Sequence, residues 1–327
     1  MTMPFPQNRP RRLRSTPALR AMVRETTLQP SDLIAPLFVK EGIDEPAPIA
    51  SMPGQAQHTL ESLRKEARSL ASRGITAFLV FAVPAHKDAE GSEAWNPAGI
   101  SQRGLQALRD ELGEGHVLIA DLCLDEYTDH GHCGVLASDG EVDNDRTLER
   151  YREIAVVQAH AGADLVAPSG MMDGQVGAIR AALDDAGFAS RGILAYAAKF
   201  ASAFYGPFRD AAECAPQFGD RSGYQMDPAN GDEAVREVRE DIAEGADIVM
   251  IKPALAYLDV IRRVKEATSF PLAAYNVSGE YAMVKAAAAN GWIDERRVVL
   301  EILTGIRRAG ADLILTYHAG DVADWLN

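Results

Sequence analysis

Short runs of β-branched and aliphatic residues alternate with amphipathic helical stretches along most of the chain. In Leu60–Ser72 and Leu148–His160, apolar residues return every three or four positions, which predicts helices. Eight apolar runs have the length of buried strands, and strands that alternate with helices predict a parallel sheet. These runs are Asp32–Val39, Thr76–Val83, His116–Leu124, Asp164–Pro168, Ile193–Phe200, Asp247–Lys252, Pro271–Val277 and Leu313–His318. Eight strand–helix units predict an α/β fold, a (β/α)8 TIM barrel.

The joins between helices and strands repeat one sequence. Ala161-Gly-Ala-Asp-Leu-Val, Glu244-Gly-Ala-Asp-Ile-Val and Ala309-Gly-Ala-Asp-Leu-Ile each place a glycine before an apolar run, and Arg73-Gly-Ile-Thr is a looser copy. We expect this glycine to end the helix, with the strand following at once. The alternative, an open doubly wound sheet, lacks support because no Gly-x-Gly-x-x-Gly fingerprint or P-loop follows any strand.

Composition agrees with a globular protein of a reducing compartment. The chain has 327 residues, 47% hydrophobic and 24% charged. Length alone would suggest two domains, but α/β barrels of this size form one. No apolar run approaches the ~20 residues that a membrane span needs, and no signal-peptide pattern begins the chain. Three cysteines, an odd number, do not form a disulfide framework, so we expect a reducing compartment.

Charge separates the first residues from the rest. The net charge of −14 argues against nucleic acid and anionic membranes as partners. Residues 1–24 nevertheless hold six of the 33 basic residues and no acid, while the remainder has 27 basic against 47 acidic residues. We expect an extended N-terminal arm over residues 1–30 and a catalytic barrel over residues 31–327. The arm could be disordered, lie on a neighbouring subunit or be a transit peptide, although three prolines in the first ten residues fit a transit helix poorly.

Two lysines end neighbouring predicted strands. Lys199 ends Ile-Leu-Ala-Tyr-Ala-Ala-Lys and Lys252 ends Ile-Val-Met-Ile-Lys, where barrel active sites lie. We expect burial to lower the pKa of such a lysine from about 10.4, and a second ammonium to lower it further, which leaves an amine able to attack a carbonyl. One such lysine could equally form a buried ion pair or reach solvent. Two on adjacent strands favour Schiff bases with a keto substrate.

A cysteine-containing motif follows the third strand. In Asp121-Leu-Cys-Leu-Asp125 the strand period of two puts Asp121, Cys123 and Asp125 on one face, and a loop then brings round Cys133. Two thiolates and a carboxylate could bind Zn²⁺ and leave a coordination position open. Two ordinary buried thiols beside a loop carboxylate are the alternative. Cys214, alone in Ala-Glu-Cys-Ala-Pro, is interpreted as an ordinary buried cysteine.

The stretch of residues 201–230 is too long for a simple turn between strand and helix. Loops of this length in barrels are usually lids over the active site. Within it, Arg209 and Arg221 could pair with a substrate carboxylate through two hydrogen bonds each. Solvation on the surface is the alternative for both side chains.

Several blocks of sequence resemble one enzyme family nearly from end to end. They include Leu33-Ile-Ala-Pro-Leu-Phe-Val-Lys, Asp121-Leu-Cys-Leu-Asp-Glu-Tyr-Thr-Asp-His-Gly-His-Cys-Gly134, Ala167-Pro-Ser-Gly-Met-Met-Asp-Gly174, Ala198-Lys-Phe-Ala-Ser-Ala-Phe-Tyr-Gly-Pro-Phe-Arg-Asp-Ala-Ala212, Val249-Met-Ile-Lys-Pro253 and Ala274-Tyr-Asn-Val-Ser-Gly-Glu280. Together they resemble the porphobilinogen synthase family, also called 5-aminolevulinate dehydratases. The resemblance implies a hydro-lyase that condenses two 5-aminolevulinate molecules to porphobilinogen, with loss of two waters, in tetrapyrrole (heme) synthesis.

The resemblance also implies roles for particular residues. One substrate would be held at Lys252 and the other at Lys199, with Asp121 as a nearby acid, base or orienting group. The residues that would bind the two substrate carboxylates are Ser278 and Tyr317 at the first site, and Arg209, Arg221 and Gln225 at the second. Two lysines would hold two identical molecules in unequal sites, so that the new bonds form in one orientation only.

Metals and assembly are also implied by the resemblance. Zinc members of the family have three cysteines where this chain has Cys123, Asp125 and Cys133, and magnesium-type members have aspartate and alanine, so this set is intermediate. Glu237 matches a ligand of an allosteric magnesium, and otherwise is an ordinary exposed helix acid. Gly170 stands where Asp is frequent, which removes a carboxylate. A homo-octamer whose arm embraces a neighbour is expected, with no organic cofactor.

Two rival functions stay open at the level of sequence. A Schiff-base aldolase is also a barrel, but it needs one lysine, so Lys199 and the cysteine motif count against it. An inactive relative kept as a ligand-binding or structural oligomer would not need both lysines and both arginines. An assay for pyrrole formation from 5-aminolevulinate separates all three readings.

Overall fold

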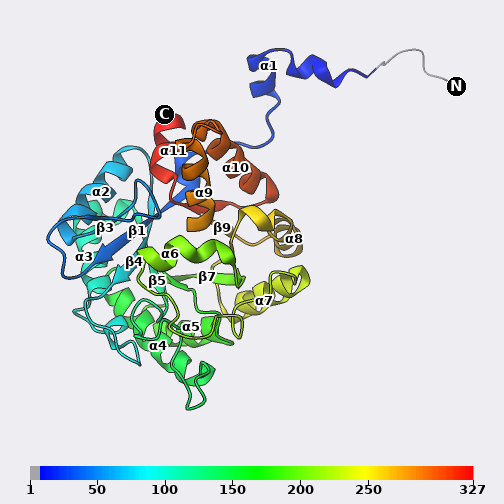
Figure 1. The fold of residues 1–327 in the computed structure, drawn as a ribbon. Coiled ribbons are helices and arrows are strands. Elements are labelled where there is room, and N and C mark those ends of the chain that lie inside the picture. Colours follow the sequence, from blue (N-terminus) through cyan, green and yellow to red (C-terminus); the bar gives the residue numbers. More distant parts are fainter. Residues whose placement is uncertain (1–7, 327) are drawn as a thin grey trace.

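The computed structural model describes residues 8–326 and has a closed barrel at its centre. Eight parallel strands pair in chain order, and pairing of the last with the first closes the ring. They are β1 (Leu33–Lys40), β4 (Ala77–Val83), β5 (Val117–Leu122), β6 (Leu165–Pro168), β7 (Gly192–Lys199), β8 (Ile248–Lys252), β9 (Leu272–Asn276) and β10 (Leu313–Thr316). The ribbon shows helices arranged around this sheet (Figure 1). The predicted barrel is confirmed.

Helices connect successive strands and cover the outside of the barrel. They are α2 (Leu60–Ser72), α3 (Ile100–Leu112), α4 (Asn144–His160), α5 (Gln175–Asp185), α7 (Gly231–Glu244), α8 (Leu258–Thr268), α9 (Ser278–Ala289), α10 (Glu295–Ala309) and α11 (Ala319–Leu326). A further short helix, α6 (Gly206–Ala211), lies in the connection between β7 and α7. Helix α2 has the bounds predicted from its periodicity. Helix α4 begins at Asn144, four residues before the predicted start, because the Asp143 side chain accepts a hydrogen bond from the Arg146 N–H and caps it.

The repeated glycine–alanine–aspartate joins do two jobs. All four glycines of these joins have positive φ and end a helix, as predicted: Gly74, Gly162, Gly245 and Gly310. The aspartate that follows has a role that the sequence did not reveal. Each of Asp164, Asp247 and Asp312 accepts a hydrogen bond from a backbone N–H of the preceding barrel strand, at 2.8–2.9 Å. Each join therefore ties a new strand to its neighbour.

Side chains of the strands form two apolar layers. In β1, Ile34 and Phe38 belong to the cluster inside the barrel, whereas Leu33 and Leu37 belong to the cluster between sheet and helices. This alternation is the strand period of two in a closed sheet that is buried on both faces. The inner cluster is rich in aromatic rings, among them Phe38, Phe81, Tyr196 and Tyr275.

Most strand bounds lie within one residue of the prediction, and three larger details differ. The third strand ends at Leu122 rather than Leu124, because the Leu124 carbonyl accepts the N–H groups of Tyr127 and Thr128 and the chain turns there. The eighth ends at Thr316 rather than His318. A short hairpin of β2 (Ala47–Pro48) and β3 (Ala56–His58), which was not predicted, adds to the edge of β1.

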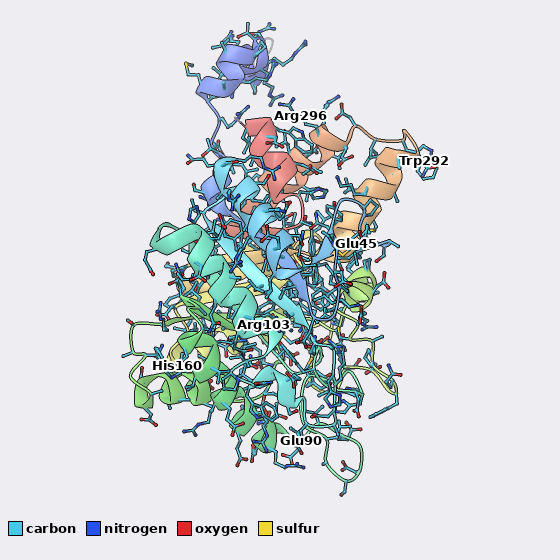
Figure 2. All side chains as sticks on the ribbon, turned by 90° about the vertical axis from the view of Figure 1, so that its left-hand side faces the viewer. Glu45, Glu90, Arg103, His160, Trp292 and Arg296 are labelled. Carbon is cyan, nitrogen blue, oxygen red and sulfur yellow. The ribbon has the colours of Figure 1, made fainter. Side chains whose placement is uncertain are left out.

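The first described helices of the chain stand apart from the barrel. A 3-10 helix over Pro10–Arg14 and α1 (Pro17–Met22) have no buried residue. In Figures 1 and 2 this segment projects beyond the body of the molecule. Residues 1–7 of the expected arm lie outside the described residues. The division at residue 30 stays a prediction.

Across residues 8–326, no helix combines the length and apolarity required to cross a membrane.

Candidate active site

The two lysines at the ends of β7 and β8 are direct neighbours in the sheet. Lys199 pairs with Lys252 in the register of the two parallel strands. Between Ala195 and Ala198 the register shifts by one residue, so β7 has a bulge there. Tyr196 lies in the inner cluster, so strict alternation would have turned Lys199 outward; the bulge turns it to the same side as Lys252. Both lysines are only 4% exposed.

Aromatic rings surround the amine of Lys252. The Nζ atom lies 4.6 Å from the ring centre of Tyr275 and 5.1 Å from those of Tyr196, Tyr205 and Phe208. Burial lowers the pKa of Lys252 to about 7, and the positive charge of Lys199 contributes to the same shift. The amine is therefore substantially neutral at physiological pH, as the sequence predicted. This cage was missed, although Tyr196 and Tyr275 stand in strand blocks that the sequence analysis had singled out.

Lys199 has a different environment from its neighbour. Its Nζ atom donates a hydrogen bond to the Ser169 carbonyl oxygen at 2.5 Å. Burial acts to lower the pKa of Lys199, but the negative charges of the Cys133 thiolate and of Asp125 oppose burial, and the pKa lies above its usual value. The expectation of a lowered pKa is wrong for this lysine. The two lysines are thus chemically unequal.

Asp121, the carboxylate at the end of β5, is buried beside the lysines. Its Oδ2 accepts a hydrogen bond from the Ser169 hydroxyl at 3.3 Å, whereas Oδ1 has no partner among the described residues. Burial raises the pKa of Asp121 to about 7, the negative charge of Asp125 adds to the rise, and the two lysines oppose it. A group with this pKa can give or take a proton near neutral pH.

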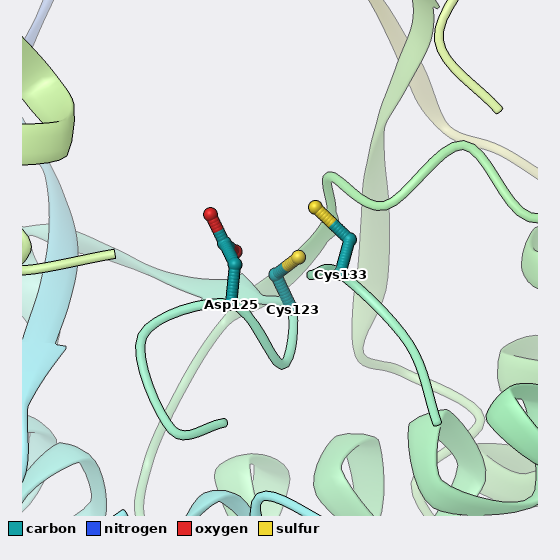
Figure 3. Close-up of side chains that lie close together, drawn as sticks. All are labelled: Cys123, Asp125 and Cys133. Atoms are coloured by element: carbon teal, nitrogen blue, oxygen red, sulfur yellow. The ribbon is translucent and has the colours of Figure 1, made fainter. Parts of the chain in front are cut away.

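Cys123, Asp125 and Cys133 come together as a group that could hold a metal. All three are buried, and their ligand atoms lie within 4.8 Å of one another. Figure 3 shows the three side chains close together beside the turn after β5. Because β5 ends at Leu122, the turn rather than strand alternation brings Cys123 and Asp125 to one side. Two sulfurs and a carboxylate oxygen are a suitable set for a tetrahedral ion that keeps one position open.

The metal-ligand candidate Asp125 is also bound to Arg221. The Arg221 guanidinium donates to Asp125 Oδ2 at 2.8 Å, and the two side chains are each 4% exposed. Arg221 donates further to the carbonyl oxygens of Gly131 and Cys214. The pKa of Asp125 lies well below its usual range, because the charges of Arg221 and Lys199 overcome the effect of burial. Asp125 and Arg221 were predicted to belong to separate sites, whereas in the structure their side chains are in contact.

The long connection after β7 closes over the barrel with its polar donors partly unused. Arg209 lies on α6, and Arg221 and Gln225 lie in the segment that follows. The Nε atoms of both arginines and the Nε2 atom of Gln225 are buried without a hydrogen-bond partner among the described residues. Buried donors without partners are unfavourable, so these three residues form a set that an acceptor-only group, such as a carboxylate, would satisfy.

Ser278 and Tyr317 lie on the other side of the Lys252 cage. The Ser278 hydroxyl accepts a hydrogen bond from the Phe208 N–H at 2.9 Å and thereby ties α6 to the start of α9. The Tyr317 hydroxyl is 2.7 Å from the Tyr275 hydroxyl, and Tyr275 is the nearest ring to the Lys252 amine. Both hydroxyls are thus close to side chains that contact Lys252.

Glu237 lies outside this centre, in a cavity of about 440 Å³ at the surface of α7. The cavity is lined mainly by oxygen-bearing side chains and by the loop that carries Gln225. Its lining includes Glu141, Asn144, Asp173, Tyr224, Gln225, Glu233 and Glu237. Burial raises the pKa of Glu237, and the charges of Glu240 and Asp173 raise it further. A cation in this cavity would relieve that repulsion.

Comparisons with known proteins agree with this geometry. Residues 7–325 match the sequence profile of the family described as delta-aminolevulinic acid dehydratase. Proteins of that name from Mycobacterium leprae, Synechococcus elongatus and Bacillus subtilis are 58%, 58% and 54% identical, over 99%, 98% and 98% of this chain and 98%, 99% and 98% of their own.

A solved structure has the same fold over nearly the whole chain. The crystal structure of the Toxoplasma gondii delta-aminolevulinic acid dehydratase (porphobilinogen synthase), in complex with its reaction product porphobilinogen, superposes with a TM-score of 0.95 and 46% identity. The match covers 98% of this chain and 91% of that one. This chain belongs to the delta-aminolevulinic acid dehydratase (porphobilinogen synthase) family, the hydro-lyases of heme and tetrapyrrole biosynthesis.

Proposed function

We propose that Lys252 and Lys199 carry the dehydratase reaction of the family, by forming Schiff bases with two molecules of 5-aminolevulinate. The observation that carries this proposal is the pairing of two buried lysines in register, one of them with a pKa of about 7. A neutral amine attacks a ketone and releases water, and a protonated imine is a better electrophile than the ketone. Joining the two substrates through one carbon–carbon and one carbon–nitrogen bond, with loss of two waters, gives porphobilinogen.

The site around Lys252 suits the first substrate. The Ser278 and Tyr317 hydroxyls would bind the carboxylate of that substrate, while the aromatic cage shields the imine from water. Both hydroxyls already meet partners that contact Lys252, so their positions are constrained by packing. Groups held in this way lose little freedom when the substrate binds.

The site around Lys199 suits the second substrate. Its carboxylate would accept hydrogen bonds from Arg209, Arg221 and Gln225, each of which has a buried donor without a partner. A charged pair of this kind fixes the molecule in one orientation. Asp121, with a pKa of about 7, would move protons between the two bound substrates. The two sites then differ in both charge and shape, which allows identical substrates to react in unequal roles.

We propose zinc at Cys123, Asp125 and Cys133. Thiolate sulfur binds Zn²⁺ well and Mg²⁺ poorly, since Mg²⁺ prefers an octahedron of oxygen atoms. When bound, the ion would act as a Lewis acid beside the second substrate. The protein's own contribution is to hold three donors within 4.8 Å of one another. Because Arg221 already binds Asp125, we expect zinc to be held weakly or below one ion per chain.

Magnesium would bind elsewhere, in the cavity that contains Glu237. The side chains that line it offer oxygen ligands, which Mg²⁺ prefers. Tyr224 and Gln225 also line this cavity, and the Tyr224 hydroxyl accepts a hydrogen bond from the Cys133 N–H at 3.3 Å. An ion near Glu237 would thus bias the loop that reaches both the second substrate and the thiolate group, as an allosteric activator does.

The proposed partners and location follow the family. We propose a homo-octamer in the cytoplasm, with the basic arm on a neighbouring subunit and no nucleic acid or membrane partner. Over residues 8–30, the described part of the arm, no residue is buried within its own chain, which suits a segment that packs against another copy.

Pyrrole formation from 5-aminolevulinate tests the proposed reaction. The purified protein should form a product that gives the colour reaction of a free pyrrole, and Lys252→Met should form none. A Schiff-base aldolase would trap substrate without making pyrrole, and an inactive relative would do neither. An active Lys252→Met protein would contradict the assignment.

A further inference from the structure

Tyr151 of α4 joins the backbone of one metal-site cysteine to the sulfur of the other. Its hydroxyl donates a hydrogen bond to the Cys133 carbonyl oxygen at 2.7 Å and lies 3.7 Å from the Cys123 Sγ. The side chain is fully buried, with no exposed surface. One hydroxyl therefore contacts both cysteines, which are ten residues apart in the chain.

Gly170 has no side chain, which leaves room for the Tyr151 hydroxyl. A Cβ atom built on Gly170 would lie 1.8 Å from the Tyr151 hydroxyl oxygen and 2.8 Å from the ring carbon that bears it. Neither separation is tolerated, so no side chain fits at position 170 while Tyr151 keeps its place. The carboxylate found missing there in the sequence analysis is thus replaced by a phenol that enters from α4.

Helix α4 fixes the cysteine loop at two points. One turn before Tyr151, the Thr147 hydroxyl accepts a hydrogen bond from the Val135 N–H at 3.0 Å. Together, Thr147 and Tyr151 hold residues 133–135 against the helix, and Tyr151 alone also reaches Cys123. A rigid helix is a better support for a ligand group than a loop, because its side chains are fixed by packing.

We propose that Tyr151, in the space left by Gly170, is a positioning residue that holds Cys123 and Cys133 at the separation needed to bind one metal ion. The inference rests on the proposed zinc site and extends it to a residue outside the ligand set. A neighbour that hydrogen-bonds to the ligands orients them, and its loss typically weakens metal binding about 10- to 100-fold. Since this site has only two sulfur ligands, their spacing matters more than in a site with three.

Tyr151→Phe removes the hydroxyl and keeps the ring. We expect zinc affinity, measured by competition with a chromophoric chelator, to fall about 10-fold. The charge-transfer and d–d absorption bands of the cobalt-substituted protein should change as well, which a role in folding alone would not cause. Tyr281→Phe is the matched control, because it removes another buried hydroxyl that binds a backbone carbonyl, that of Pro53, without touching the cysteines. Its affinity and spectrum should equal those of the wild type.

Gly170→Ala tests the same hydroxyl from the other side. The added methyl group should displace the Tyr151 hydroxyl and lower zinc affinity at least as much as Tyr151→Phe does. In the double variant, the loss of zinc-binding free energy should be smaller than the sum of the two single losses, because both changes remove the same contact. Zinc affinity within two-fold of wild type, with an unchanged cobalt spectrum, in either single variant would overturn the inference. Failure of the wild-type protein to bind zinc at all would instead refute the zinc site itself. Thermal unfolding of the metal-free proteins establishes that each variant is folded.

Discussion

Lys199 and Lys252 are both lysines on adjacent strands, yet their surroundings give their amines different pKa values. Aromatic rings offer the Lys252 ammonium weaker stabilisation than water does, so its pKa falls to about 7. Lys199 faces the thiols and a backbone carbonyl, and its pKa rises. At neutral pH we therefore expect Lys252 to react first.

This difference predicts where substrate is trapped, and at what pH. After incubation with 5-aminolevulinate, reduction with borohydride should tether substrate to Lys252, as mapped by peptide mass spectrometry. The amine is neutral above its pKa, so trapping should be nearly complete after incubation at pH 8 and should decline as the pH falls through 7. All samples are reduced at the same pH, so the reactivity of borohydride is constant and only the pH of the incubation varies. Label found only on other lysines would refute the assignment.

Replacing Lys199 by methionine tests whether the charge of Lys199 contributes to the low pKa of Lys252. The positive charge of Lys199 lowers the pKa of Lys252, so Lys199→Met should shift the midpoint of trapping to higher pH. Burial remains, so the pKa should not return to its usual value. A midpoint that stays in place, or moves to lower pH, would contradict the coupling of the two amines.

Alternation along a strand predicts the position of one lysine but not of the other. In β8, Met250 lies in the inner cluster, so Lys252 two residues later also faces inward. Lys199 faces inward only because β7 has a bulge between Ala195 and Ala198, and no glycine or proline lies at the bulge to mark it. Its position depends on pairing with β8, which is a tertiary effect that a single sequence does not reveal.

At the scale of elements, the connection from β7 to α7 is the segment that we propose to bind the second substrate. Sequence length alone predicted a lid, and the structure adds that α6 is tied to α9 by the bond between Phe208 and Ser278. The contact between Asp125 and Arg221 joins this lid to the turn after β5. Neither contact could be predicted, because each links segments more than 60 residues apart.

Arg209→Ala tests the lid as a binding element. If Arg209 pairs with the carboxylate of the second substrate, losing a charge-assisted hydrogen bond worth about 1.5–3 kcal/mol should lower kcat/KM about 10- to 150-fold. Trapping of substrate at Lys252 should survive. Arg262→Ala, which removes an exposed arginine of α8, should leave kinetics unchanged. Wild-type kinetics in Arg209→Ala would exclude the proposed role.

The two proposed metal sites should respond to different substitutions. Cys133→Ala should lose zinc, because one of only two sulfur ligands is gone, and activity measured with zinc should fall. Glu237→Ala should keep its zinc content but lose stimulation by magnesium. Glu266→Ala on α8 is the control, since Glu266 is exposed and does not line the cavity. Full zinc content in Cys133→Ala, or undiminished stimulation in Glu237→Ala, would contradict the respective assignment.

At the scale of the whole molecule, several apolar side chains are exposed on one chain alone. Leu13 and Met22 in the arm are 50% and 71% exposed, and Trp292, after α9, is 77% exposed (Figure 2). Scattered exposed apolar residues are common, but Leu13 and Met22 lie in a basic segment whose two short helices have no buried residue. A helix as short as α1 is marginal in water, so it needs a partner surface. The barrel closes without this segment, so we propose that the segment serves assembly.

Deletion of residues 1–24 should therefore reduce the size of the assembly without unfolding the barrel. The deletion removes six arginines and no acid, so it also removes the charge that would draw the arm to an acidic neighbour. In sedimentation velocity, the full-length protein should run as an octamer and the truncated protein as a smaller species, with circular dichroism unchanged. High salt should also shift the full-length protein toward smaller species, because salt screens the attraction between exposed charges. Leu13→Asp is a milder test of the apolar contribution. A truncated protein that sediments like the full-length chain would show that the arm does not hold the subunits together.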